Sequence, residues 1–276
     1  MNGLFPRMRG FLALGYLFML APLVYVVVYS FNSSRFVTVW EGFSFKWYAQ
    51  LWQNNVLMKA AGISLQVAFC AATIAVIIGT IAAVAYTRFP MMRGRGFLSF
   101  ISIAPMVLPE VVLGMAFLMA YLVLQDWVGL PRNRGMITII IAHATIGMAY
   151  AFIMIRNRLR NFDAAIIEAA MDLGATPLGI FFKITIPIIA PTLVASWLLV
   201  FILSFDDLVV ASFVSGAEVT TLPMAIFSSI KFGLTPEINA LAAVMIFILS
   251  ILLIVISGKL TRKNEPGLLI QAPEEE

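Results

Sequence analysis

Long apolar stretches separated by short polar connectors dominate the pattern of hydrophobic and polar residues along the chain. Six of these stretches have about the 20 apolar residues that a helix needs to cross a bilayer. They cover residues 11–31, 60–86, 97–124, 136–155, 192–214 and 238–257. The pattern therefore predicts an all-α integral membrane protein with six transmembrane helices, in which residues 1–276 form a single transmembrane domain.

The amino-acid composition is that of a chain surrounded mainly by lipid. Hydrophobic residues make up 62% of the 276 residues and charged residues only 12%. A soluble domain carries about 25% charged residues, so the chain falls well outside that class. The connectors between the apolar stretches are also too short to hold a separate soluble domain.

The basic residues predict how the chain is oriented in the membrane. With a cytoplasmic N-terminus, 12 of the 18 Lys and Arg residues lie on the cytoplasmic side and the other 6 outside. Cytoplasmic loops are enriched in these residues, so both termini are expected inside, with residues 258–276 as a cytoplasmic tail. The net charge of +4 is then explained by the Lys and Arg residues that orient the chain in the membrane. A nucleic-acid partner is not expected, because the basic residues do not gather on one soluble face.

The first outer connector, residues 32–59, is rich in aromatic residues. They include Trp40, Trp47, Tyr48 and Trp52. Because Trp and Tyr gather at membrane interfaces, we expect a short helix lying on the outer leaflet. Trp47 is in addition a candidate for stacking on a substrate or on a binding protein, with interfacial anchoring as the simpler interpretation.

The cytoplasmic connector at residues 156–191 begins with a predicted helix in "RNRLRNFDAAIIEAAMDLGA". Asp163 is a plausible N-cap of this helix. Its apolar face would consist of Ile166, Ile167, Ala170 and Leu173. Glu168 and Asp172, four residues apart, would lie on the opposite, exposed face.

The same connector then predicts a turn and a second short helix. Gly174 is placed to end the first helix as a C′ glycine. Thr176 can cap the second helix and Pro177 suits its first position. Pro187 and Pro191 flank the start of the fifth span. The product is a helix-turn-helix that protrudes into the cytoplasm, although an ordinary solvated loop with standard caps would have the same spacing.

The segment "EAAMDLGATPLGIFFKITIP" resembles the EAA motif of ATP-binding-cassette (ABC) importer permeases, at Glu168, Ala169, Ala170, Gly174, Ile186 and Pro187. In that family the loop forms coupling helices that dock into a groove on the nucleotide-binding subunit. The resemblance implies that Glu168 pairs with the ATPase, that the two alanines permit close approach and that Gly174 gives the turn. The expected ATPase-coupling residues are Glu168, Ala169, Ala170, Asp172, Gly174 and Pro187.

Four further segments are similar to the polyamine (putrescine and spermidine) permeases. They are "SFNSSRFVTVWEGFSFKWY", "APMVLPEVVLG", "LSFDDLVVASFVSG" and "TTLPMAIFSSIKFGLTPEINALA". The resemblance implies the ABC type I importer permease fold and a permease subunit that moves polyamine across the bacterial inner membrane. It also implies a second homologous permease, an ATPase dimer that hydrolyses ATP and a periplasmic polyamine-binding protein as partners.

Three acidic residues, Glu110, Asp206 and Asp207, lie inside the predicted spans. An Asp near the middle of a membrane helix costs about 2.5–3.5 kcal/mol on insertion scales, so such residues are functional candidates. No Lys or Arg lies inside a predicted span to neutralise them. They must therefore line water, be protonated or meet a cation, and a diamine would suit carboxylates set among apolar walls. The alternative is that Asp206 caps a helix break or bonds a neighbouring backbone.

The chain contains one histidine, His143, in the fourth predicted span. Without a Cys or carboxylate nearby in the sequence, it is expected to be a hydrogen-bonded helix contact, and no metal site is predicted. The sequence has no phosphate-binding loop and no catalytic Ser/His/Asp set in a soluble cleft. We therefore expect a non-catalytic subunit that binds no cofactor of its own.

Other functions remain compatible with parts of this pattern. Within the same importer class, the cargo could be another small solute such as an organophosphonate or ferric ion. An ion-driven secondary transporter would use Glu110 and Asp206 as proton or sodium sites, but such folds often contain inverted repeats, and no repeat is evident. A membrane scaffold protein would have no use for carboxylates inside the membrane.

Overall fold

The computed structural model of the protein describes residues 4–36, 39–233 and 235–263. Within these residues the secondary structure is helical, apart from one β-bridge between Asn32 and Phe43. This confirms the all-α prediction. The chain divides into two compact units, with Met1–Asn55 and Ser229–Glu276 in unit 1 and Val56–Ser228 in unit 2.

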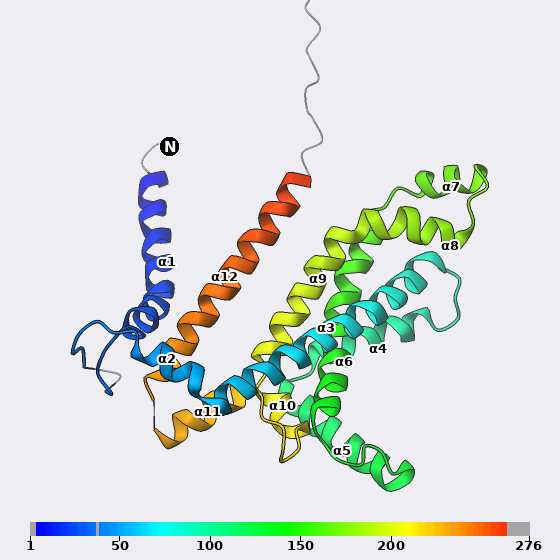
Figure 1. The fold of residues 1–276 in the computed structure, drawn as a ribbon. Helices are drawn as coiled ribbons and strands as arrows, with labels where there is room; N and C mark the ends of the chain where they lie inside the picture. The colour runs from blue at the N-terminus through cyan, green and yellow to red at the C-terminus, as the bar shows by residue number, and fades with distance from the viewer. Residues whose placement is uncertain (1–3, 37–38, 234, 264–276) are drawn as a thin grey trace, which may run out of the picture. The chain divides into compact units, whose positions relative to one another are not determined.

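In unit 1, the long helix α12 (Glu237–Lys263) packs against both α1 (Leu4–Tyr29) and α2 (Lys46–Gln53) (Figure 1). Helices α1 and α12 correspond to the first and last of the six predicted spans. The amide of Asn54, just after α2, donates to the carboxylate of Glu237 over 2.8 Å. Helix α2 is the short helix that the aromatic-rich connector predicts.

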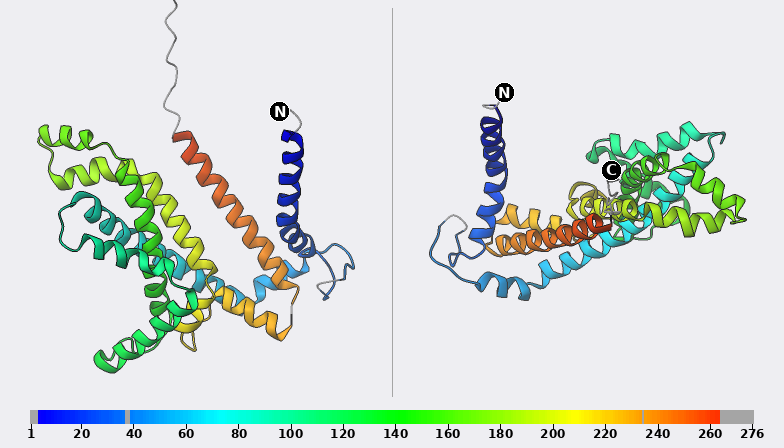
Figure 2. Two further views of the ribbon diagram at one scale, coloured as in Figure 1. Left: turned by 180° about the vertical axis from the view of Figure 1, so that it is seen from behind. Right: turned by 90° about the horizontal axis from the view of Figure 1, so that it is seen from above.

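Unit 2 contains the middle four predicted spans and the cytoplasmic connector. Its helices, in chain order, are α3 (Asn55–Arg88), α4 (Arg95–Val107), α5 (Glu110–Val128), α6 (Met136–Arg160), α7 (Ala164–Asp172), α8 (Pro177–Ile180), a π-helical turn (Phe181–Thr185), α9 (Ile186–Asp206) and α10 (Val209–Val214). Helix α11 (Leu222–Phe232) follows and crosses the boundary of the two units. Figures 1 and 2 show α7 and α8 at one end of unit 2 and α10 towards the opposite end.

Helix α6 lies at the centre of unit 2, where it packs against α4, α9 and α10. Small residues let these helices approach closely, as is usual for helices packed in membranes. A Cβ atom added at Gly147 would lie 2.3 Å from Cγ1 of Val200 on α9 and 3.2 Å from Cβ of Ala75 on α3. Only glycine fits this crossing, and the cavity described below begins beside it.

Five helical runs in the described residues are long and apolar enough to cross a membrane, the last of them Pro177–Asp206. Helix α12, 27 residues long, contains the sixth predicted span. The prediction of one helix over residues 97–124 is corrected, because α4 ends at Val107 and α5 begins at Glu110. Pro109 has no N–H to donate and disfavours helical geometry at Leu108, which is extended (ψ 141°).

Candidate functional site

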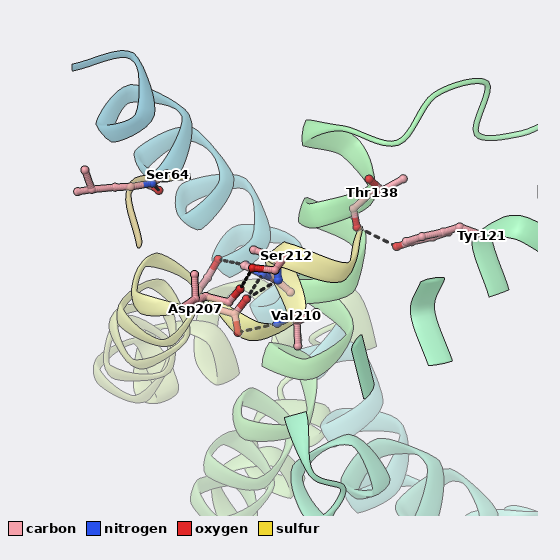
Figure 3. Close-up of polar contacts among 11 residues, drawn as sticks. Ser64, Tyr121, Thr138, Asp207, Val210 and Ser212 are labelled. Carbon is pink, nitrogen blue, oxygen red and sulfur yellow. Dashed lines mark hydrogen bonds and ion pairs between the residues drawn. The ribbon is translucent and has the colours of Figure 1, made fainter. Parts of the chain in front are cut away.

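The fifth predicted span, residues 192–214, is broken at Asp207. Helix α9 ends at Asp206, Asp207 is extended with ψ 122°, and α10 begins at Val209. The carboxylate of Asp207 accepts hydrogen bonds from the backbone N–H groups of Val210 (3.3 Å) and Ala211 (2.7 Å) (Figure 3). It therefore caps the first turn of α10, the role that the sequence analysis considered for Asp206.

His143 on α6 contacts both sides of this break. Its Nε2 lies 3.0 Å from Oδ2 of Asp207, and its Nδ1 lies 2.7 Å from Oγ of Ser204 on α9. His143 and Ser204 are 5% and 8% exposed. The prediction that His143 is a hydrogen-bonded helix contact is confirmed. The sequence shows no carboxylate close to His143, and the fold brings Asp207 to it across 64 positions of sequence.

A cavity of about 60 Å³ opens beside this cluster. It is lined by Glu110, His143, Ile146, Gly147, Tyr150, Val200, Leu203, Ser204, Asp207 and Val210. One water molecule needs about 10–15 Å³ of such space. The cavity can therefore hold a few water molecules, or an ammonium group together with a water molecule. Two carboxylates among apolar and aromatic walls make this cavity suited to an organic cation.

The structure brings together two of the three acidic residues that the sequence singled out. Glu110, the first residue of α5, is exposed and lines the same cavity as Asp207. Asp206 is also exposed but is not part of the cavity lining. Asp206 is the last residue of α9, whereas Asp207 is extended and directs its carboxylate to the start of α10.

Trp47 does not present a free ring for stacking. In unit 1 its side chain is only 5% exposed, and the indole N–H donates to the carbonyl of Asn32 over 2.6 Å. The ammonium group of Lys46 lies 4.5 Å from the ring centroid. The assignment of Trp47 to the substrate pathway therefore has no support from its surroundings, since the ring is taken up by packing within the outer connector.

The cytoplasmic connector begins with α7, as predicted. Oδ1 of Asp163 accepts from the backbone N–H of Ala165 over 2.9 Å, which confirms the N-cap. The predicted apolar face is only half correct. Ile167 and Ala170 are buried against Ile180, whereas Ile166 is 43% and Leu173 88% exposed.

Gly174 ends α7 in a left-handed conformation, with φ +78°. Its N–H donates to the carbonyl of Met171 over 2.8 Å, and that of Ala175 donates to Ala170 over 3.0 Å. These two bonds form a Schellman motif, so the predicted C′ glycine is confirmed.

The second predicted helix begins correctly but does not end as a short separate element. Oγ1 of Thr176 accepts from the N–H of Gly179 over 3.2 Å, and Pro177 occupies the first turn of α8. The chain then runs through the π-helical turn directly into α9. A π turn adds a residue before Pro187, where a regular helix would need an N–H that proline lacks. The sequence pattern predicted a short separate helix before the fifth span, whereas one helical run, Pro177–Asp206, leads from the connector into that span.

The predicted coupling residues occupy two kinds of place. Glu168, Ala169, Asp172, Gly174 and Pro187 are exposed, whereas Ala170 is 8% exposed and packs inside the connector. A set of exposed apolar side chains beside the two acids was not predicted from the sequence. They are Met171 (52%), Leu173 (88%), Leu178 (72%) and Phe182 (64% exposed). Met171 and Leu173 lie outside the run Pro177–Asp206 that could cross a membrane, and exposed apolar side chains in such a place are typical of a surface that another protein covers.

The fold defines the class of protein to which this arrangement belongs. A bacterial ABC transporter for import of the acidic polysaccharide alginate matches over 95% of this chain and 96% of its own, with TM-score 0.68 and 19% identity. The inward-facing MetNI methionine ABC transporter matches over 78% of this chain and 97% of its own, with TM-score 0.62 and 18% identity. At these identities the likeness shows the fold, which is that of ABC importer membrane subunits.

Residues 75–266 match the family described as binding-protein-dependent transport system inner membrane component. The chain belongs to this family of multi-pass inner-membrane permeases, which are non-catalytic components of ABC transporters. It is 52% identical to the putrescine transport system permease protein PotI of Escherichia coli K12, over 85% of this chain and 84% of PotI. It is 41% identical to the spermidine/putrescine permease PotC of Haemophilus influenzae, over 93% and 96% of the two chains.

Proposed function

We propose that this chain is a permease subunit of a polyamine importer, most simply one for putrescine. The cavity that contains Glu110 and Asp207 carries this proposal, because it places two carboxylates among apolar walls inside a transport fold. A diamine has two ammonium groups separated by methylenes and matches that lining. The relatives named as putrescine and spermidine permeases support the same substrate class.

The proposed partners follow from the family and from the exposed connector. A second permease would complete the pathway, a periplasmic binding protein would deliver the polyamine, and two ATPase subunits would dock on α7 and α8. ATP would be hydrolysed by these subunits, and this chain would bind no cofactor. Both termini would lie in the cytoplasm, on the side of the ATPases, and the distribution of Lys and Arg supports this orientation.

In this proposal the docked ATPases move the permease between inward- and outward-facing states. Glu168 and Asp172 supply charge on the exposed side of α7, and the neighbouring exposed apolar side chains supply area to bury. Pro177–Asp206 forms one helical run, so a displacement of α8 would act directly on α9 and on the break at Asp207. The connector and the cavity are thereby joined by one continuous element.

The proposal is tested by purifying the intact complex and measuring its stoichiometry and its ATP hydrolysis with a panel of polyamines. Stimulation by putrescine- or spermidine-loaded binding protein supports it. If ATP hydrolysis were stimulated by an organophosphonate or ferric ion and not by polyamines, that solute would replace polyamine as the proposed substrate. Uptake by this chain without any ATPase would overturn the proposal in favour of an ion-driven transporter.

Glu168→Ala tests the docking surface within the same complex. Loss of an exposed charge should hardly change the stability of the chain. We expect uptake in proteoliposomes to fall at least about tenfold, since the loss of a partnered charge at an interface costs about 2 kcal/mol or more. Polyamine capture by the binding protein should be unaffected. Normal uptake by this variant would remove Glu168 from the coupling surface.

A further inference from the structure

The cluster of His143, Ser204 and Asp207 joins three helices inside unit 2. His143 comes from α6, Ser204 from the last turn of α9, and Asp207 caps α10. The contact of His143 Nε2 with Oδ2 of Asp207, at 3.0 Å, joins α6 to the start of α10. A buried polar cluster of this kind fixes the geometry of the helices it joins when every member has a partner.

The hydrogen bonds of His143 persist in both charge states of its ring. In the neutral ring, Nε2–H donates to the Asp207 carboxylate and Nδ1 accepts from the hydroxyl of Ser204. In the protonated ring, Nδ1–H donates to the same hydroxyl oxygen and the contact at Nε2 becomes an ion pair. His143 can therefore gain or lose a proton without a change of neighbours.

Few other charged or titratable side chains surround the cluster. Glu110 from α5 and Tyr150 from α6 line the same cavity, and exposed Asp206 precedes Asp207 at the end of α9. The neighbouring segments 60–85, 96–107 and 209–214 of α3, α4 and α10 contain no Asp, Glu, Lys, Arg or His. With a neutral His143, the cavity lining holds two carboxylates and no cation. Protonation of His143 places one positive charge beside them.

We propose that His143 positions Asp207 for the transported cation and that a proton on His143 competes with this cation for the Asp207 carboxylate. The inference rests on the proposed function, because it takes the cavity as part of the pathway of an organic cation. His143 holds the carboxylate at the start of α10, where it shares one cavity with Glu110.

The physical basis is charge balance in a cavity of low dielectric constant. A diamine brings two ammonium groups, and each is stabilised by a carboxylate. A histidinium at 3.0 Å from Oδ2 already satisfies Asp207 and repels a second cation. Uptake should therefore be lower with a protonated His143 than with a neutral one.

The test uses the intact complex, with binding protein and ATPases, in proteoliposomes that have the same pH on both sides. Putrescine uptake below saturation is compared between wild type and His143→Gln at pH 8 and pH 5.5. The Gln amide can still donate to Asp207 but cannot take up a proton. The ratio of the two uptake rates cancels effects of pH on the binding protein and the ATPases.

We expect the ratio of wild-type to His143→Gln uptake to fall about tenfold from pH 8 to pH 5.5, because only the wild-type ring can take up a proton that competes with the cation. A constant ratio would overturn the competition. At pH 8, His143→Gln should retain more uptake than His143→Ala, because only Gln keeps a donor for Asp207. Equal uptake by these two variants would overturn the positioning role.

Asp207→Asn provides a second route if His143→Gln does not assemble. The Asn side chain can still cap α10 but leaves no charge for which a proton and a cation compete. The wild-type uptake should then fall with acid relative to the residual uptake of Asp207→Asn, and parallel profiles would contradict the inference. A wild-type complex that takes up no polyamine at any pH would instead overturn the proposed function itself.

Discussion

The acidic side chains of the connector that contains α7 and α8 are exposed to solvent. In the cavity beside α10, by contrast, the carboxylate of Asp207 is hydrogen-bonded to other groups of the fold. Glu168 and Asp172 are exposed at the surface of a short helix. Asp207 has two backbone donors and His143 as partners. The same kind of side chain is therefore exposed to a partner protein in one region and held in a fixed position by its own fold in the other.

This difference has a simple physical origin. An exposed carboxylate is solvated by water, so the absence of a protein partner costs the fold little free energy. Such a side chain can therefore remain unpaired until another subunit docks. A buried carboxylate must be satisfied inside the fold, because an unpaired buried charge is costly. We therefore expect substitutions at the cavity to affect folding and transport together, and substitutions in the connector to affect mainly transport.

The largest effect is expected for Asp207→Ala, with Asp206→Ala as its matched control. Loss of Asp207 removes the cap of α10 and leaves Nε2 of His143 without its carboxylate partner, which together should cost about 2–4 kcal/mol of stability. Asp206 is exposed outside the cavity lining, so its loss should cost less than about 0.5 kcal/mol. Thermal unfolding of the purified complex measures both, and equal shifts in Tm would contradict the distinction between the two residues.

A smaller effect is expected for Gly147→Ala in the packing around the cavity. The new methyl group would collide with Val200, so the helices α6 and α9 must separate at a cost of about 1–3 kcal/mol. Gly62→Ala on α3 is the control, since its Cβ would meet no atom within 4 Å and alanine favours a helix by about 1 kcal/mol. The comparison requires the same thermal measurement, and a Gly147→Ala variant as stable as Gly62→Ala would refute the close packing.

The smallest effect on folding is expected for Gly174→Val in the connector. Nothing lies within 4 Å of a Cβ at Gly174, so the cost comes from φ +78° alone, about 1–2 kcal/mol for a side chain in this region. Gly174→Asn should cost less, because Asn tolerates the left-handed conformation. Uptake should fall more in the Val variant than in the Asn variant, while binding-protein capture stays intact. Two variants with equal uptake would show that the turn is not what matters.

Much of the connector could be predicted from the sequence because its signals are local. Asp163 caps the helix that begins directly after it, and Gly174 ends that helix within two residues of its last turn. Each signal acts over a few positions, so no knowledge of distant residues was needed. The exposed positions of Leu173 and Ile166 were not predicted, because helical periodicity does not say which apolar residues find a partner.

The cavity could be predicted only in part. A charge rule identified Glu110, Asp206 and Asp207, since acidic residues are rare in membrane spans. It could not separate Asp206 from Asp207, and it left His143 without its carboxylate. The different roles of Asp206 and Asp207 depend on where α9 ends. The contact of His143 with Asp207 depends on which face of α6 packs against the end of α9.

By itself, the sequence determined the class of the molecule, its apolar helices, the turn at Gly174 and the family to which the chain belongs. The class, the helices and the turn follow from composition and from residues close together in the chain, and the family follows from resemblance to known permeases. The tertiary structure alone decided that the fifth span breaks at Asp207 and that His143 meets this carboxylate. Residues 64 positions apart become neighbours only through the packing of α6 against α9 and α10, and that packing depends on side-chain shape along all three helices.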